Sequence, residues 1–197
     1  IDRSLRTVFL ALLFVAALGA VGLFVVEVGS TSPDPVAFED TVTVGLTLES
    51  EYSLGEDVDL PRAQVFYSQY QYVVGYYGVE TFIDQQRQPE HEQRFGYPMT
   101  VYVSDYSDTE VELNDNGYPV TDGTPGWTDA ETAWFVIGSD AQTPAGDTVI
   151  PFEDRTDARA FTDAHGGTVH DWESTLEQSF ERDDAAVARD RVTDHRQ

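Results

Sequence analysis

The side chains best suited to chemistry in this chain are two histidines in the stretch HGGTVH, which begins at His165 and ends at His170. Imidazole is the commonest metal-binding side chain, and Asp163 and Asp171 lie close to the two histidines in the sequence. A copper or zinc site needs three or four ligands that converge on one ion. His165 and His170 are therefore candidate metal ligands. The alternative is that His165 interacts with the last carbonyls of a helix and His170 is a surface strand residue.

Met99, the only methionine, is a third candidate ligand. A thioether sulfur is a soft donor that suits Cu(I). The spacing of Met99 with Val101 and Val103 instead predicts a place in the buried face of a strand. His91 lies in the charged stretch PEHEQR, which reads as a loop, and could join Met99 only if that loop folded over it. His195 lies in a charged terminal segment and has no predicted role.

Residue patterns for covalent catalysis are absent from the sequence. The chain has no cysteine, which excludes disulfides, thiolate metal sites and cysteine nucleophiles. It contains neither Ser-x-x-Lys nor Gly-x-Ser-x-Gly, and no helix with a lysine follows the turn-rich stretch GYPVTDGTPG. We therefore expect no enzymatic activity. The tyrosine-rich segment 66–77 is a candidate interface, since tyrosine is enriched at binding surfaces, although such a segment is also ordinary in a half-buried sheet.

The charge of the chain is strongly acidic. Asp and Glu number 36 against 11 basic residues, all of them Arg, for a net charge of −25. Such a charge keeps a protein soluble but strains its compact state, and molar salt relieves the strain by shortening the screening length to about 3 Å. This composition is what we expect of a halophile. Nucleic-acid binding is not expected, because no basic stripe is present to displace counterions from phosphates.

The amino-terminal segment reads as a membrane anchor. Val8 to Val26 is an uninterrupted run of 19 apolar residues, close to the length that crosses the hydrocarbon core. Arg3 and Arg6 precede it and acidic residues follow, so the amino end should be cytoplasmic and the rest extracytoplasmic. We predict a single-pass cell-membrane protein with an anchor at residues 1–28 and a linker at 29–40. A cleaved signal peptide is the alternative.

Residues 41–178 are predicted to form one α+β domain, followed by a charged helix or tail at 179–197. Two units share the order strand, strand, helix, strand, which suggests a pseudo-repeated domain with one helix on each small sheet. The first unit comprises a strand at 41–49, a hairpin within 64–74, a helix at 77–88 and a strand at 97–106. The second comprises strands at 133–139 and 147–154, a helix that starts after Asp154 and ends at Gly166, and a strand at 168–172.

The helix of the second unit is the best-defined predicted element. The carboxylate of Asp154 can accept hydrogen bonds from the first turn. Ala158, Phe161 and Ala164 are expected to face inward. Gly166 supplies a left-handed stop.

Residues 134–172 also carry a specific set of short motifs. They are FV followed closely by GS, a P-x-G loop, PF, DAxAF and HGGxV, in that order. The stretches AQVFY at Ala63 and VYVSDYSD at Val101 fit earlier strands of the same pattern. Together they resemble the NosL family, the accessory proteins of nitrous oxide reductase. The likeness spans about Ala63 to Leu176 and implies two strand-strand-helix-strand units outside the cytoplasmic membrane.

The resemblance also implies a function, since NosL proteins bind Cu(I) and help to supply copper to the enzyme that reduces nitrous oxide. The family usually carries Cys-x-Met near the start of the domain and a Met in the loop that reads PAG here. This chain has no Cys, and Ala145 stands at the loop position. The sequence thus resembles a divergent, haloarchaeal-type NosL protein without the usual ligands.

Two functions follow from these observations. The first is a membrane-anchored accessory protein that handles copper or assists the maturation of a copper enzyme, with Met99, His165 and His170 as Cu(I) ligands. The second is a metal-free module that binds a protein partner on the outer surface of the membrane. A copper enzyme or a copper transporter is the expected partner.

Overall fold

The computed structural model describes residues 32–46, 50, 54–55 and 57–180. Contacts divide the chain into residues Ile1–Asp34 and Pro35–Gln197, and every helix and strand below belongs to the second unit. The predicted anchor at residues 1–28 lies outside the described residues, as does the tail from residue 181. Within the described part, no helix is both long and apolar enough to cross a membrane.

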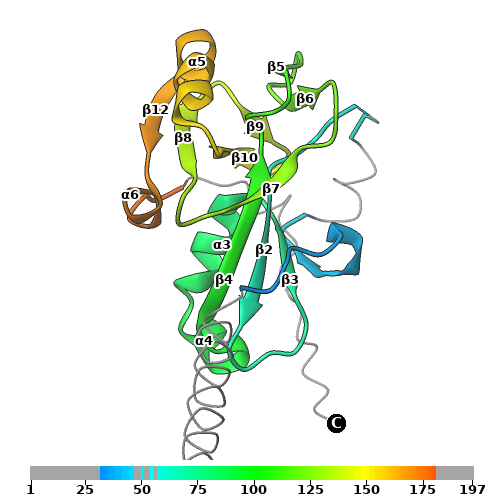
Figure 1. Cartoon of the computed structure of the whole chain (residues 1–197), viewed down its shortest axis with the longest axis vertical. Coiled ribbons are helices and arrows are strands. Elements are labelled where there is room, and N and C mark those ends of the chain that lie inside the picture. Colours follow the sequence, from blue (N-terminus) through cyan, green and yellow to red (C-terminus); the bar gives the residue numbers. More distant parts are fainter. Residues whose placement is uncertain (1–31, 47–49, 51–53, 56, 181–197) are drawn as a thin grey trace, which may run out of the picture. The chain divides into compact units, whose positions relative to one another are not determined.

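The first of two main sheets has five strands in the order β1-β3-β2-β4-β7 (Figure 1). β2 is antiparallel to β3 and to β4, β4 is antiparallel to β7, and β1 is parallel to β3. The helix α3 packs against β2 and β3, and α4 follows it. The strands are β1 (Val42–Val44), β2 (Arg62–Tyr67), β3 (Val74–Tyr77), β4 (Pro98–Asp105) and β7 (Gly126–Asp129), and the helices are α3 (Val79–Gln86) and α4 (Pro89–Phe95).

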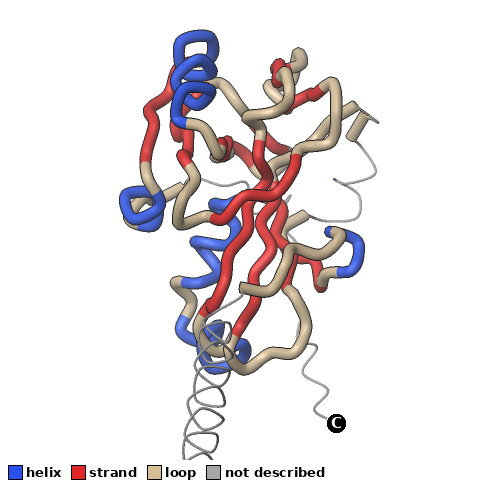
Figure 2. Tube along the Cα trace, viewed as in Figure 1, coloured by secondary structure: helices blue, strands red, loops and turns tan. Residues whose placement is uncertain are grey.

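The second sheet has three strands in the order β11-β8-β12. The helix α5 packs against all three strands of this sheet, and the short α6 follows β12. Two hairpins, β5–β6 and β9–β10, complete the domain with the short helix η1 (Figure 2). The remaining bounds are β8 (Trp134–Ser139), β11 (Ile150–Phe152), β12 (Gly166–His170), α5 (Arg155–His165), α6 (Trp172–Leu176), β5 (Val111–Leu113), β6 (Pro119–Thr121), β9 (Gln142–Thr143), β10 (Gly146–Asp147) and η1 (Phe38–Asp40).

The same connection occurs in both sheets. In each, a central strand (β2 or β8) is followed by an antiparallel neighbour (β3 or β11), then by a helix, then by a return strand on the other side of the central one (β4 or β12). The predicted α+β class is confirmed. The order strand, strand, helix, strand is present in both halves.

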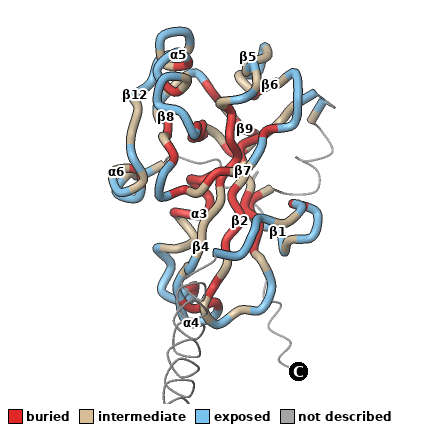
Figure 3. Tube along the Cα trace, in the orientation of Figure 1, coloured by how far each residue is buried: buried red, intermediate tan, exposed pale blue. Residues whose placement is uncertain are grey.

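The cores lie between each sheet and its helix. In α3, Val79, Phe82 and Ile83 are buried, and in α5 Ala158 and Phe161 are buried, because residues three or four positions apart share one face of a helix. Burial is concentrated along the middle of both sheets (Figure 3). Phe135 and Val149 of the second half belong to the core cluster of the first sheet, so this cluster connects the two halves, while a second cluster lies beneath α5.

Several local predictions differ from the structure in α5 and α4. Ala164 is exposed rather than inward, and Asp154 holds the N-cap position of α5 without a side-chain hydrogen bond to the helix. Gly166 ends α5 with a φ of 74°, as predicted. The stretch PEHEQR, expected to be a loop, is the helix α4, because Pro89 occupies its first turn, where proline is tolerated.

The strands at the edges also differ from prediction. β1 is an edge strand with Val42 exposed and Val44 only half-buried, so it lacks the buried face that its alternation predicted. Residues 47–49 of that predicted strand lie outside the described residues. The turn-rich region 114–126 contains β6 of the β5–β6 hairpin.

Residues 35–40, assigned to the linker from the sequence, and Thr41 after them contact the first sheet. The backbone of Val36 exchanges two hydrogen bonds with the side-chain amide of Gln64, at 2.9 and 3.2 Å, and Phe38 is buried. A Cβ at Gly75 would lie 2.1 Å from Thr41 Oγ1. Glycine at this position of β3 therefore lets the segment approach the strand backbone.

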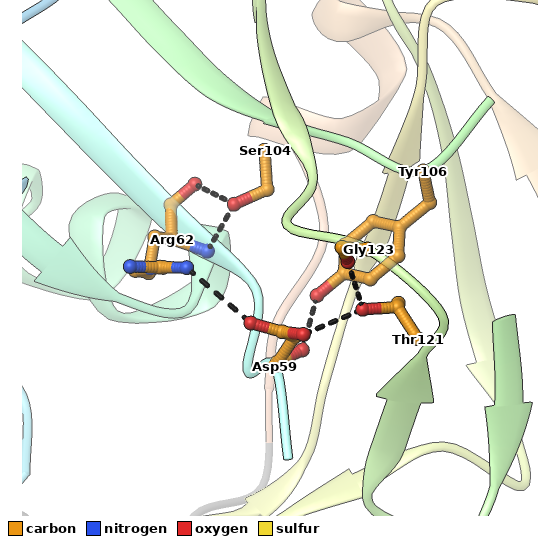
Figure 4. A network of polar contacts seen from close by, with 6 residues as sticks. All are labelled: Asp59, Arg62, Ser104, Tyr106, Thr121 and Gly123. Carbon is orange, nitrogen blue, oxygen red and sulfur yellow. Dashed lines mark hydrogen bonds and ion pairs between the residues drawn. The ribbon is translucent and has the colours of Figure 1, made fainter. Parts of the chain in front are cut away.

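A polar network at Asp59 connects β2, β4 and β6 (Figure 4). The Tyr106 hydroxyl donates to the Asp59 carbonyl at 2.5 Å, and the Thr121 hydroxyl lies 2.5 Å from the Asp59 carboxylate. Arg62 pairs with the same carboxylate at 3.7 Å, and its backbone N–H donates to Ser104 Oγ at 3.0 Å. The network fixes the start of β2 against the end of β4.

Glu80 makes a second connection between the two halves. Its side chain is buried in the first turn of α3. Its carboxylate lies 3.1 Å from the Thr148 hydroxyl, and it accepts the Val149 backbone N–H at 3.3 Å. Buried polar groups are costly when they lack partners, so this carboxylate fixes the segment before β11 against α3.

We expect Glu80→Ala to lower the free energy of unfolding by about 1–3 kcal/mol, because it leaves the Thr148 and Val149 donors buried without an acceptor. Chemical denaturation in molar KCl measures the change. The exposed Glu90 of α4 provides the control Glu90→Ala, which should change stability far less. Equal effects of the two substitutions would contradict the structural role of Glu80.

Candidate functional site

The two candidate histidines lie at opposite ends of β12. His165 is the last residue of α5, and its ring packs on Phe161 with centroids 4.6 Å apart. His170 ends β12, and its Nε2 is hydrogen-bonded to the Thr168 hydroxyl at 2.7 Å. The strand from Gly166 to His170 spans about 13 Å at the usual rise per residue. The structure therefore separates the two imidazoles along the strand.

The two aspartates beside these histidines have different surroundings. Asp171 caps α6 by accepting the Ser174 backbone N–H at 2.9 Å, and hydrogen bonding to the side chain and then the backbone of Ser174 lowers the pKa of the Asp171 carboxyl. Asp163 is exposed on α5. Across the described part of the chain, no three His, Asp or Glu side chains are grouped so that they could hold one metal ion.

Met99 lies in solvent, not in the core that its spacing predicted. Phe66 of β2 pairs with Thr100, while the next residue, Tyr67, pairs with Pro98. β4 thus holds one extra residue, Met99, and such a β-bulge breaks the alternation of side chains between the two faces. The Met99 side chain is 58% exposed. It belongs to the first sheet, whereas both candidate histidines flank a strand of the second.

The loop at which the family carries a methionine is the tight β9–β10 hairpin. Ala145 is buried there, and its backbone N–H donates to Thr143 Oγ1 at 3.2 Å. A methyl side chain offers no donor atom to copper. The Ala145 side chain therefore cannot serve as a Cu(I) ligand.

A buried polar cluster that the sequence did not reveal surrounds His91. His91 Nε2 lies 2.8 Å from the Tyr67 hydroxyl and 3.4 Å from the Tyr76 hydroxyl, and the two hydroxyls are 2.8 Å apart. The His91 ring also packs on Phe95, with centroids 4.7 Å apart. His91 and Phe95 are four residues apart and follow a proline. This spacing is the one signal that could have placed His91 on a buried helix face.

The polar groups of this cluster are uncharged at neutral pH. Burial lowers the pKa of His91, and the charge of Arg94 lowers it further, so the imidazole is neutral at pH 7. Burial also raises the pKa of the Tyr67 and Tyr76 phenols, which therefore stay protonated and offer no anionic oxygen. The cluster fixes α4 against β2 and β3.

The described chain is thus a small α+β domain with two main sheets, each packed against its own helix. The family model described as NosL matches residues 56–179 of the chain. The chain belongs to the NosL family.

Two solved structures are similar to this one. The copper chaperone NosL from Shewanella denitrificans has a TM-score of 0.53 and 20% sequence identity, over 73% of this chain and 96% of that one; this likeness shows the fold. The apo-NosL protein from Achromobacter cycloclastes has a TM-score of 0.39 and 26% identity, over 56% of this chain and 82% of that one. A search of curated proteins found no match.

The His91 cluster predicts a pH dependence of stability. In the folded chain the pKa of His91 lies below its ordinary value of 6.5. At higher pH the imidazole is neutral in both the folded and the unfolded chain, and the contribution of His91 to stability is fully present. As the pH falls below about 6.5, the unfolded chain binds a proton that the folded chain does not, and the free energy of unfolding decreases. Urea denaturation at a series of pH values measures this loss.

The matched variants are His91→Gln, which removes the titrating group, and His165→Gln, which changes a partly exposed histidine. His91→Gln should flatten the decline in stability below pH 6.5, and His165→Gln should largely retain it. An unchanged decline in His91→Gln would show that another group causes it.

Proposed function

We propose that the chain is a membrane-anchored, extracytoplasmic accessory protein, not an enzyme, that handles copper during the maturation of a copper enzyme such as nitrous oxide reductase. The match of the NosL family model to residues 56–179 carries this proposal. The fold shared with a NosL described as a copper chaperone supports it. The apolar segment 8–26 and the arginines before it support the anchor and its orientation.

The available ligands limit how copper could be held. The chain has no cysteine, and Ala145 leaves the family loop without a donor. The thioether of Met99 is the one soft donor in these 197 residues, and it is open to solvent. A single thioether, or one with an imidazole from elsewhere in the chain, would bind Cu(I) weakly compared with a thiolate site. We therefore propose transient handling of Cu(I), with Met99 as the main ligand and His165 and His170 as lesser candidates.

A metal-free interaction module is the second candidate, and one surface favours it. Tyr72, Tyr97 and Met99 are 56%, 62% and 58% exposed, and we call these three residues the aromatic tip. The Ser68 backbone N–H donates to the Tyr97 carbonyl at 3.0 Å, so the loop after β2 lies beside the residues after α4. Tyrosine and methionine are enriched in protein interfaces. The tip therefore suits contact with the copper enzyme or transporter.

Copper handling is tested by competition titration of the full chain with Cu(I), in detergent micelles and molar KCl, against a chelator of known affinity. We expect about one equivalent to bind, binding to be lost in Met99→Ala, and the double variant His165→Ala/His170→Ala to weaken it less. Val42→Ala, which truncates another exposed apolar side chain, is the control and should bind as the parent does. Absence of binding in the parent chain would rule out copper handling.

The interaction module is tested with purified nitrous oxide reductase from the same host, in the presence of a copper chelator. We expect the parent chain to bind the enzyme without copper and Tyr72→Ser/Tyr97→Ser to lose most of that affinity, measured by surface plasmon resonance. Val42→Ser is the control, because it removes an exposed apolar side chain from β1. Equal losses in the control and the double variant would show that the aromatic tip is not the contact.

A further inference from the structure

A pocket lies between α5, β11 and the segment that follows β4. Its volume is about 240 Å³, and Tyr106, Phe152 and Phe161 form its base. These three aromatic side chains are buried, and neighbouring rings are in contact, with centroids 6.3 Å and 5.6 Å apart. The base is therefore rigid and apolar, and the more exposed residues of the wall decide what could bind.

The wall carries polar groups at both ends. Asp157 and His165 both line the pocket from α5; they are eight residues apart and so lie on one face of the helix, about 12 Å apart along its axis. Ala160 and Ala164 line the wall between them and leave space there.

Thr109 also lines the pocket. Its hydroxyl is buried and has no hydrogen-bond partner within the part of the chain that the structure describes. A buried polar atom without a partner is rare in folded proteins and calls for an explanation, such as a water or a bound group.

The charge of the lining residues determines whether the pocket favours a positively or a negatively charged ligand. Asp157 is the only lining residue with a formal charge at neutral pH, and the net charge of the chain, −25, raises the local concentration of cations. A carboxylate at one end of the pocket disfavours an anion. A metal ion is also disfavoured, since no three His, Asp or Glu side chains in the described ranges converge on one point.

The size of the pocket restricts the ligand further. An apolar cavity of about 150 Å³ holds one benzene molecule, so a pocket of about 240 Å³ has room for one ring and a short polar group. We propose that the pocket binds a small organic ammonium ion with an apolar body of about one ring. The ammonium group pairs with Asp157 and donates a hydrogen bond to the Thr109 hydroxyl, which gives that hydroxyl its missing partner, and the apolar body lies along Ala160 and Ala164. The pocket shares His165 with the candidate copper ligands, and its other lining residues take no part in the proposed copper handling.

The test is an NMR titration of the full chain in lipid nanodiscs and molar KCl, with benzylammonium as the probe. Benzyl alcohol and benzoate are the neutral and anionic controls of the same size. We expect benzylammonium to shift the resonances of Thr109 and His165 in a saturable way, benzyl alcohol to bind more weakly and benzoate not to bind.

Two carboxylates of α5 form a matched pair of variants. Asp157→Asn should weaken benzylammonium binding about fivefold, the upper range for a solvent-accessible ion pair, and should leave benzyl alcohol binding unchanged. Asp163 is exposed on the same helix and does not line the pocket, so Asp163→Asn should have little effect. Ala164→Phe, which fills the pocket, should abolish binding of both probes.

Two results would overturn the proposal. One is the absence of saturable shifts at Thr109 and His165 with benzylammonium. The other is an equal loss of affinity in Asp157→Asn and Asp163→Asn, which would show that the acidic surface attracts the cation without using the pocket.

Discussion

Tyr106 is the residue on which the relation between the two sheets depends. It follows β4 directly and is fully buried, and its backbone N–H donates to the Pro151 carbonyl of β11 at 3.2 Å. Its hydroxyl donates to the Asp59 carbonyl at 2.5 Å, and burial raises its pKa, so it remains a donor. Asp105, the residue before it, accepts the Glu153 backbone N–H at 2.8 Å. The end of β4 is thereby joined to β11 and to the start of β2, and the pocket beneath α5 has its base at the same place.

Much of the fold follows from short-range patterns in the sequence. The buried positions of α3 and α5 follow the helical period, and Gly166 ends α5 where its type predicts. The prediction for α4 was wrong because charged residues dominate PEHEQR, although a helix needs only one apolar face and His91 and Phe95 supply it. The contacts of residues 35–41 depend on partners in β2 and β3 that are distant in sequence, so local pattern could not reveal them.

The candidate site was less predictable because it depends on register. A single extra residue in β4 moves Met99 from the core into solvent, and alternation cannot show where such a bulge occurs. His165 and His170 are close in sequence, but an extended strand separates them, and His91 is buried against tyrosines from two other strands. The short motifs identified the family correctly, since they record a fold. The identity of a metal ligand set depends on single residues, and in this chain those residues differ from the usual family ligands.

The bulge at Met99 has a consequence for redox chemistry. With no cysteine and one methionine, the 197 residues contain a single sulfur atom, and the bulge exposes that atom to solvent. The lone pairs that could bind a cuprous ion are also the ones that an oxidant attacks, and conversion to the sulfoxide replaces a soft donor with a polar oxygen. Oxidation of Met99 would leave the core intact, since the Met99 side chain is not packed there. The same exposure would let methionine sulfoxide reductase reach and repair the side chain.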